Sequence, residues 1–253
     1  MSDITISTLG GIPLIAADDD LAAIILKAAA ADGLEFTDGD VLVVAQKIIS
    51  KAEGRLTRLS DVEPGKAALA LADETEKDPR LVQLILDESA TVLRHKPGVI
   101  IVRHKLGHVG ANAGIDQSNI AHDEGDAALL LPRDPDASAA RLFDTLKEMT
   151  GKHVGVIIAD SMNRPWRMGT VGGAIGCAGV QVLDDLRGAK DMFGRELKVA
   201  MVNRADSIAA MASLVMGETT ERTPVALVRG LPVAAEGGSA RDIMRPLEDD
   251  LFK

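Results

Sequence analysis

The chain has 253 residues, of which 46% are apolar and 26% charged, and a formal net charge of −10. This length and composition allow a substantial apolar core and exclude a disordered or fibrous protein. The negative charge, without a dense run of Lys or Arg, argues against nucleic acid as a partner. Cys177 is the only cysteine, no secretory signal is visible, and no apolar run approaches the roughly 20 residues that span a bilayer, so we expect a cytoplasmic protein outside the membrane.

Short apolar and β-branched runs alternate with helical patterns along the chain. The runs that predict strands are residues 4–8, 41–45, 99–102, 154–159, 199–202 and 225–228. The patterns that predict helices are residues 21–31, 66–71, 81–89, 137–150 and 208–216. Because residues 91–132 and 164–200 lack a strong helix, the strand–helix–strand rhythm is broken, and we predict a mixed α and β protein rather than a doubly wound sheet.

Standard nucleotide and hydrolase motifs are missing. The sequence has no Gly-x-x-x-x-Gly-Lys-Ser/Thr loop, no Gly-x-Gly-x-x-Gly fingerprint, no Gly-x-Ser-x-Gly elbow and no His-Glu-x-x-His helix. His104, His108 and His122 have no metal-ligand spacing either. A nucleotide or a metal ion would therefore be bound by another architecture.

Two lysines follow the strand predicted at residues 41–45, in the segment Gln46-Lys-Ile-Ile-Ser-Lys51. If this segment begins a helix, Lys47 and Lys51 present their ammonium groups on one side, where they could meet a polyphosphate. Lysines that simply face solvent are the alternative.

The segment from Gly110 to Asn119 combines small residues with one aspartate, Asp116. Small residues let a backbone approach a ligand closely, and a carboxylate is a suitable ligand for Mg²⁺ or Mn²⁺. Asn119 could hydrogen-bond a base or a ribose. The alternative is an Asx-type turn in which both side chains only cap their own backbone.

Asp160 and Ser161 end the apolar run at residues 154–159, and Arg164-Pro-Trp166-Arg167 follows shortly after. A carboxylate and a hydroxyl at the end of a buried strand suit a metal–phosphate site, and the two arginines could hold a phosphate or a carboxylate. The alternative is a structural ion pair between the aspartate and one of the arginines.

Five glycines lie within residues 169–179. We expect this run to form an amide-lined cradle for an anion beside the arginines. A tight crossing of two backbone segments, or a contact between subunits, is the alternative.

Glu218 lies in a predicted loop after the helix at residues 208–216, because Gly217 is a natural helix stop. It is a third acidic candidate for a metal site. An ordinary surface glutamate is the alternative, and Glu221 competes for any role of this loop.

Taken in order, these segments resemble the coenzyme F420-0:γ-glutamyl ligase family. The resemblance rests on Gly10-Gly-Ile-Pro-Leu14, Lys51-Ala-Glu-Gly, Asn112-Ala-Gly-Ile-Asp116, Arg164-Pro-Trp-Arg, Asp206-Ser-Ile-Ala-Ala and Asp249-Asp-Leu-Phe252. It implies an unusual α+β fold in a single ligase unit over residues 1–253, which can consist of two intertwined subdomains, and an intertwined homodimer. No flavin-type domain follows this unit in the sequence given, so the length of the glutamate tail stays open. Asn163 departs from the family, where a glycine is usual, although Asn tolerates a positive φ.

The resemblance also implies an activity and a set of site residues. The activity is a GTP-dependent ligation of L-glutamate to the deazaflavin precursor F420-0, with Mg²⁺ or Mn²⁺ as a two-ion centre and K⁺, followed by a second glutamate through a γ-linkage. The implied metal ligands are Asp116, Asp160, Ser161 and Glu218. The implied guanine-nucleotide contacts are Gly11, Ile12, Pro13, Leu14, Gln46, Lys47, Lys51, Asn119, Met216, Gly217, Glu218, Thr219, Thr220, Glu221, Arg222 and Thr223.

The residues agree with this chemistry. A carboxylate is a poor acyl donor, so a ligase converts it to an acyl phosphate that the amine of glutamate attacks. Lys47, Lys51, Arg164 and Arg167 are the candidate catalytic cations. Trp166 could stack on the deazaflavin ring or be a buried structural residue. A metal-dependent phosphatase and a non-catalytic guanine-nucleotide-binding protein are the competing hypotheses.

Overall fold

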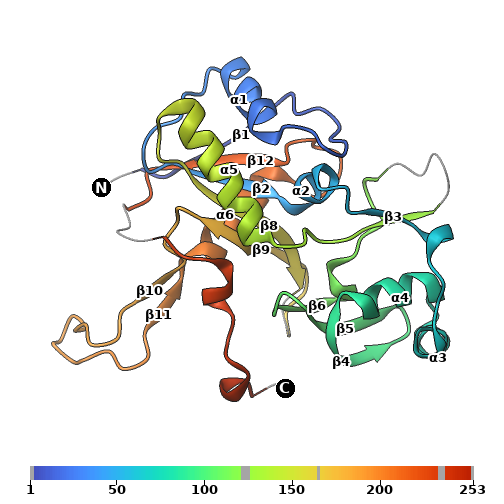
Figure 1. The fold of residues 1–253 in the computed structure, drawn as a ribbon. Coiled ribbons are helices and arrows are strands. Elements are labelled where there is room, and N and C mark those ends of the chain that lie inside the picture. The colour runs from blue at the N-terminus through green and yellow to red at the C-terminus, as the bar shows by residue number, and fades with distance from the viewer. Residues whose placement is uncertain (1–2, 121–125, 164–165, 233–236, 252–253) are drawn as a thin grey trace.

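The computed structural model describes residues 3–120, 126–163, 166–232 and 237–251. Its centre is a five-stranded sheet, here called the main sheet, in the order β1 (Thr5–Thr8), β12 (Val225–Arg229), β2 (Val41–Ala45), β8 (Gly155–Asn163) and β9 (Thr170–Ala178) (Figure 1). β2 and β8 run parallel, and the other neighbours run antiparallel. The mixed sheet confirms the predicted mixture of α and β structure.

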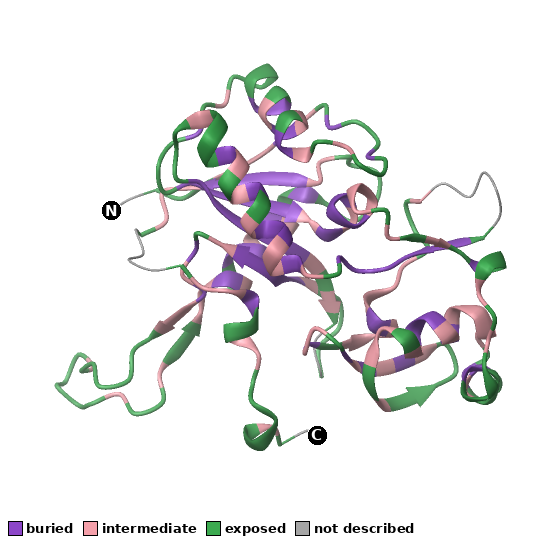
Figure 2. Ribbon diagram, viewed as in Figure 1, coloured by how far each residue is buried: buried purple, intermediate pink, exposed green. Residues whose placement is uncertain are grey.

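Both faces of the main sheet are apolar and covered. Alternate residues of β2 point to opposite faces, Leu42 and Val44 to one and Val41 and Val43 to the other. The first face packs against α1 (Leu21–Ala31), α2 (Gln46–Ala52) and α5 (Pro135–Thr150), and the second against α6 (Arg204–Met216). Figure 2 shows the buried strands at the centre of this layered arrangement.

Capping residues fix where these helices begin and end. Asp20 accepts a 3.0 Å hydrogen bond from the Ala23 amide at the start of α1. Asp134 does the same for α5, where Pro135 occupies the first helical position, so this helix begins two residues before its predicted start. Gly151, at a φ of 68°, ends α5 in the left-handed conformation that glycine adopts readily.

A second lobe, residues 56–129, lies to one side of the main sheet (Figure 1). The chain enters it through β3 (Leu56–Arg58) and leaves through β7 (Ala127–Leu129), and these strands pair antiparallel. Between them come η1 (Leu59–Asp61), α3 (Lys66–Thr75), α4 (Pro79–Asp87), β4 (Ser89–Lys96), β5 (Val99–His104), β6 (Val109–Ala111) and η2 (Asn112–Gly114). Two small apolar clusters lie inside this lobe.

A row of polar groups, here called the polar row, runs from Arg55 through Glu88 and His104 to His108. Arg55 Nη2 lies 2.8 Å from Glu88 Oε2, and His104 Nε2 lies 3.7 Å from the same oxygen. The two buried imidazole rings stack with centroids 4.9 Å apart. Burial, and then the neighbouring His104, lowers the pKa of His108 to about 4.

Two segments extend from the body of the protein. The arm, residues 183–203, pairs β10 (Leu183–Asp185) with β11 (Met201–Asn203) and projects outward (Figure 1). Its exposed apolar side chains include Met192 and Phe193. The C-terminal segment contains η3 (Ala240–Ile243) and η4 (Leu247–Asp249). None of the helices in the described part of the chain is long and apolar enough to cross a membrane.

The glycine run is a buried strand, β9, so the predicted anion cradle is wrong. A Cβ at Gly172 would lie 2.5 Å from the Ala209 carbonyl oxygen of α6, and one at Gly176 would lie 2.4 Å from the Pro135 backbone of α5. The glycines therefore let one helix pack closely on each face of β9, which is the alternative of a tight backbone crossing.

Several element boundaries differ from the prediction. The strand predicted at 154–159 continues to Asn163, which pairs with Thr170 and has no positive φ. The helix predicted at 81–89 ends at Asp87 because Ser89 begins β4, and the strand predicted at 199–202 begins only at Met201. Strands of only three residues, such as β3 and β7, carried too short a pattern to be predicted.

Candidate functional site

Four segments meet at one end of the main sheet, where β1 and β2 end and β12 begins. The Leu9 amide donates to the Val225 carbonyl, and the Ala45 amide donates to the Pro224 carbonyl. β2 stops pairing with β8 at Ala159, so the last part of β8 extends past its neighbour. This end therefore gathers residues 9–14, the start of α2, the end of β8 and the loop after α6.

Asp160 and Ser161 lie on this extended part of β8, inside the strand rather than at its end as predicted. Ser161 Oγ donates to both carboxylate oxygens of Glu218, at 2.6 and 2.8 Å. Glu218 follows Gly217, whose φ of 75° ends α6 and directs the loop toward β8. Ser161 and Glu218, both predicted as metal ligands, are thus brought together from positions far apart in the chain.

Asp116 reaches the same place from the second lobe. Its backbone bridges to Leu129, and its Oδ2 lies 2.6 Å from Lys47 Nζ of α2. The Ser118 amide donates to Asp116 Oδ1 at 2.8 Å, so the Asx-type turn considered from the sequence is also present. Burial opposes ionisation of Asp116, but hydrogen bonds from Lys47 and Ser118 outweigh it and hold its pKa below the ordinary value.

The charges of this cluster act on one another. Burial raises the pKa of Asp160 to about 6, and the carboxylates of Asp116 and Glu218 push it in the same direction. The Ser161 amide and the Lys47 ammonium group oppose this rise. The three predicted acidic residues therefore share one electrostatic environment, with Lys47 as its nearby cation.

The two lysines of α2 lie on one side of the helix, as predicted, and both contact the loop after Asp116. Lys47 Nζ donates to Ser118 Oγ at 2.9 Å, and Lys51 Nζ donates to the Asn119 carbonyl at 2.7 Å. Burial and the positive charge of Lys47 lower the pKa of Lys51. Gln46, at the start of the same helix, is buried and accepts a hydrogen bond from Ser50. These lysines are not freely solvated.

The donor set suits a hard divalent cation by its chemistry, because it consists of three carboxylates and one hydroxyl. Among the described residues, however, no group of three His, Cys, Asp or Glu side chains is arranged to hold a metal ion. Asp116 is engaged by Lys47 and Glu218 by Ser161 instead. A cation would require these side chains to turn toward one another.

Of the two glutamates in the loop after α6, only Glu218 contacts β8 in the described structure. Glu221 folds back onto its own loop and accepts a 2.8 Å hydrogen bond from the Thr219 amide, whereas Glu218 reaches β8. Thr223 Oγ1 closes the loop on the Met216 carbonyl at 2.8 Å. Thr220 and Arg222 are exposed members of this loop. Glu218 is therefore the acidic residue of the loop that faces the site.

The remaining predicted site residues differ in how exposed they are to solvent. In the segment from Gly11 to Leu14, the leucine side chain is 81% exposed, while Ile12 is buried. Arg164 lies outside the described residues, and Arg167 is exposed. Trp166 is 86% exposed with a φ of 57°, so the alternative of a buried structural tryptophan is wrong.

Ser118 is a site residue that the sequence reasoning missed. Its hydroxyl accepts from Lys47 and donates to Asp116 Oδ2 at 2.8 Å, so it connects the two charges of the ion pair. An Asx-type turn bonds the aspartate to the backbone amide two residues later, and the serine at that position was the available signal.

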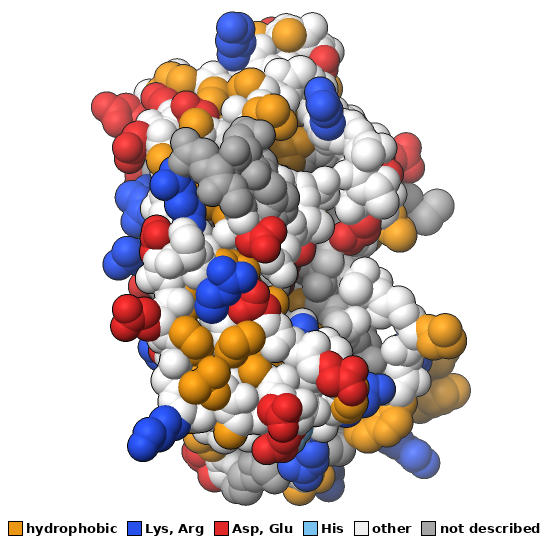
Figure 3. Space-filling view, turned by 90° about the vertical axis from the view of Figure 1, so that its right-hand side faces the viewer, with side chains coloured by type: hydrophobic (Ala, Val, Ile, Leu, Met, Phe, Trp, Pro, Cys, Tyr) orange, Lys and Arg blue, Asp and Glu red, His pale blue; other side chains and the backbone are white. Residues whose placement is uncertain are grey.

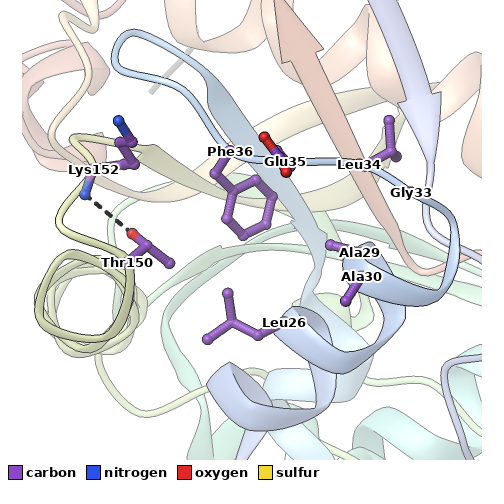
Figure 4. Close-up of a pocket in the computed structure, with 9 residues that line it drawn as sticks. All are labelled: Leu26, Ala29, Ala30, Gly33, Leu34, Glu35, Phe36, Thr150 and Lys152. Carbon is purple, nitrogen blue, oxygen red and sulfur yellow. Dashed lines mark hydrogen bonds between the residues drawn. The ribbon is translucent and has the colours of Figure 1, made fainter.

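One pocket lies away from this cluster. The pocket has a volume of about 470 Å³ and lies at the opposite end of the main sheet. Figure 4 shows Leu26 of α1 and Phe36 pointing into it, with Lys152 at its rim. On the face seen in Figure 3, acidic and basic side chains are interspersed. The pocket lacks the convergent polar groups of the cluster around Asp160.

Comparison with known proteins agrees with the resemblance seen in the sequence. The sequence model of the family described as F420-0:Gamma-glutamyl ligase matches residues 11–230. A protein of Methanothermobacter thermautotrophicus named coenzyme F420:L-glutamate ligase is 44% identical, over 98% of this chain and 99% of its own. Proteins of the same name from Archaeoglobus fulgidus and Methanocaldococcus jannaschii are 46% and 45% identical, over 96% and 85% of this chain and 94% and 85% of their own. The chain belongs to the F420-0:gamma-glutamyl ligase family.

Proposed function

We propose that this protein is a GTP- and divalent-metal-dependent ligase that joins L-glutamate to the deazaflavin precursor F420-0 and then adds a second glutamate through a γ-linkage. The observation that carries this proposal is the convergence of Asp116, Asp160 and Glu218 in one electrostatic environment beside Lys47. The relatives named coenzyme F420:L-glutamate ligase support the choice of substrates.

The reaction requires activation of a carboxylate. In the first step, a carboxylate oxygen of F420-0 attacks the γ-phosphorus of GTP, the bond to the β-phosphate oxygen breaks, and GDP leaves. In the second, the amine of glutamate attacks the acyl carbon, phosphate leaves with the bonding electrons, and the amine gives up a proton to solvent or phosphate. Positioning and charge stabilisation are the protein's contributions to such a transfer.

The residues that would hold the metal ions are Asp116, Asp160, Glu218 and the hydroxyl of Ser161. Bound Mg²⁺ or Mn²⁺, as a two-ion centre, would neutralise phosphate charge, and K⁺ is proposed as a further ion. The raised pKa of Asp160 supports this assignment, because burial, and then repulsion from Asp116 and Glu218, disfavours an ionised carboxylate there unless a cation compensates its charge.

The proposed nucleotide surface surrounds this cluster. Lys47 and Lys51 already face the loop after Asp116, and a phosphate there would accept hydrogen bonds from both ammonium groups. Residues 11–14 and the loop 216–223 lie at the same end of the sheet and would contact the guanosine. Arg164 and Arg167 remain proposed cations for the substrate carboxylate or phosphate, and the exposed Trp166 is the proposed neighbour of the deazaflavin ring.

The test is incubation of the protein with F420-0, GTP, Mn²⁺ and L-glutamate, followed by mass analysis of the deazaflavin. We expect glutamate-dependent release of GDP and a glutamylated product from the wild type. Asp160→Asn and Glu218→Gln should lower the rate at least about a hundredfold, because each removes charge stabilisation from the transfer. Asp73→Asn, at an exposed position of α3 in the second lobe, is the control and should keep full activity.

The same experiment separates the competing hypotheses. GTP hydrolysis that does not depend on glutamate would replace the proposal with a metal-dependent phosphatase. Binding of GTP with neither hydrolysis nor product would indicate a non-catalytic guanine-nucleotide-binding protein.

The proposal includes a homodimer. The arm presents large apolar side chains to solvent, with Phe193 83% exposed and Met192 and Val199 still more so, and exposed apolar groups of this kind often mark a protein interface. A second copy of this chain is the proposed partner. Sedimentation at several concentrations should give a dimer for the wild type and a smaller species for Phe193→Asp.

A further inference from the structure

The C-terminal segment begins on the main sheet. The Gly238 amide donates to the Val180 carbonyl at 2.8 Å, just beyond β9. The Ala240 amide donates to Asp136 Oδ1 at 2.7 Å, and Arg241 forms an ion pair with Asp134 at 2.8 Å. Since both aspartates lie at the start of α5, this end of the segment is tied to the body that carries Asp160.

The same segment ends on the second lobe. Met244 lies over the turn between β5 and β6, where a Cβ at Gly107 would lie 3.6 Å from its Cγ. Asp250 Oδ2 lies 2.8 Å from Arg103 Nη2 of β5, and both side chains are only 15% exposed. Residues 240–250, here called the strap, therefore connect the two parts of the protein.

The contact between Asp250 and Arg103 is connected to Asp116 through β5, β6 and η2. Arg103 pairs with Val109 in the β5–β6 ladder, and β6 continues through η2 to Asp116. The Asn112 side chain also accepts from the Ile100 amide of β5 at 3.2 Å, which fixes the path of η2. A displacement of β5 would thus be passed to the carboxylate that the second lobe supplies.

We propose that Asp250 is a positioning residue, and that its ion pair with Arg103 holds the Asp116 half of the site in register with the Asp160 half. This inference rests on the proposed function, because it concerns the metal requirement of that site. A largely buried ion pair resists opening, since removal of one partner leaves the other charge desolvated and unpaired. The strap acts through backbone position and does not contact the reacting atoms.

The first test compares Asp250→Asn with Asp249→Asn, an adjacent exposed aspartate, in the glutamate-dependent assay with varied Mn²⁺. We expect Asp250→Asn to raise the half-saturating Mn²⁺ concentration about fivefold with kcat nearly unchanged, and Asp249→Asn to match the wild type. The charge exchange Arg103→Asp with Asp250→Arg should recover most of the loss that either single change causes. An unchanged Mn²⁺ requirement in Asp250→Asn would overturn the inference, even if its melting temperature fell.

A second measurement does not depend on catalysis. Hydrogen exchange of the amides of residues 112–116, which include the Ile115 bond to Asn112, should be faster in Asp250→Asn than in Asp249→Asn. Equal exchange rates in the two variants would refute the proposed role of Asp250 and the strap. A wild type without ligase activity would refute the proposed function alone, and this exchange comparison would still decide the role of Asp250.

Discussion

The main sheet packs apolar side chains on both faces, whereas the second lobe encloses smaller apolar clusters and is joined to the body through the polar row. The first supplies Asp160 and Glu218, and the second supplies Asp116. Apolar packing is insensitive to pH, but ion pairs and buried imidazoles respond to protons and to single charge changes. The two halves of the candidate site should therefore fail under different perturbations.

The largest effect is expected in the main sheet. Gly176→Ala places a Cβ 2.4 Å from the Pro135 backbone, so α5 must move and the free energy of unfolding should fall by about 3 kcal/mol. Urea unfolding measures this loss. Gly110→Ala, whose added Cβ meets nothing within 4 Å, is the control. Equal losses in both variants would contradict the close packing of α5 on β9.

Acidification should act on the second lobe first. Unfolded His108 takes up a proton near its ordinary pKa of 6.5, but folded His108 does so only near 4, so the unfolded state binds more protons between these values. Stability present above pH 6.5 is therefore lost as the pH falls toward 4, by up to about 3 kcal/mol for this group.

The pH series needs His108→Leu as the test variant and His153→Gln, at an exposed histidine, as the control. The free energy of unfolding of β4–β6, measured by hydrogen exchange, should lose most of its dependence on pH in His108→Leu. It should keep that dependence in His153→Gln. If His108→Leu keeps the full dependence, another group is responsible.

Breaking the ion pair of the polar row should cost somewhat less. Glu88→Gln leaves Arg55 without its charged partner in a mostly buried position, and a loss of about 2 kcal/mol is expected by chemical denaturation. The exposed pair of Arg187 with Asp185 is the matched comparison, and Arg187→Gln should cause no measurable change. The reverse order would show that the polar row does not stabilise the second lobe.

The smallest effect is expected where the two halves meet. Ser118→Ala removes the hydroxyl that connects Lys47 with Asp116, and the Mn²⁺ requirement of the ligase reaction should rise about fivefold without loss of stability. Ser60→Ala, which removes an exposed hydroxyl in the second lobe, is the control. If both serine variants match the wild type, the hydroxyl bridge has no part in positioning Asp116.

The sequence predicted the central strands and most helices because their apolar patterns are strong. Residues 41–45 form β2 as predicted, and Lys47 and Lys51 share a helix face because the spacing of four residues requires it. The glycines of β9 led to the wrong prediction of an anion cradle. The sequence does not show which helix will cross a strand so closely that only glycine fits there. The pairing of Glu218 with Ser161 depends on the path of a loop, which local pattern does not encode.

The paired strands β3 and β7 carry one more consequence. Leu56 and Leu129 are register partners, so the chain leaves the main body and returns to it at neighbouring positions. The whole second lobe is thus an insertion between α2 and α5, and a short turn between these two leucines would bypass it. A protein shortened in this way should keep the main sheet, Asp160 and Glu218 while lacking Asp116, and would isolate one half of the site as a separate molecule.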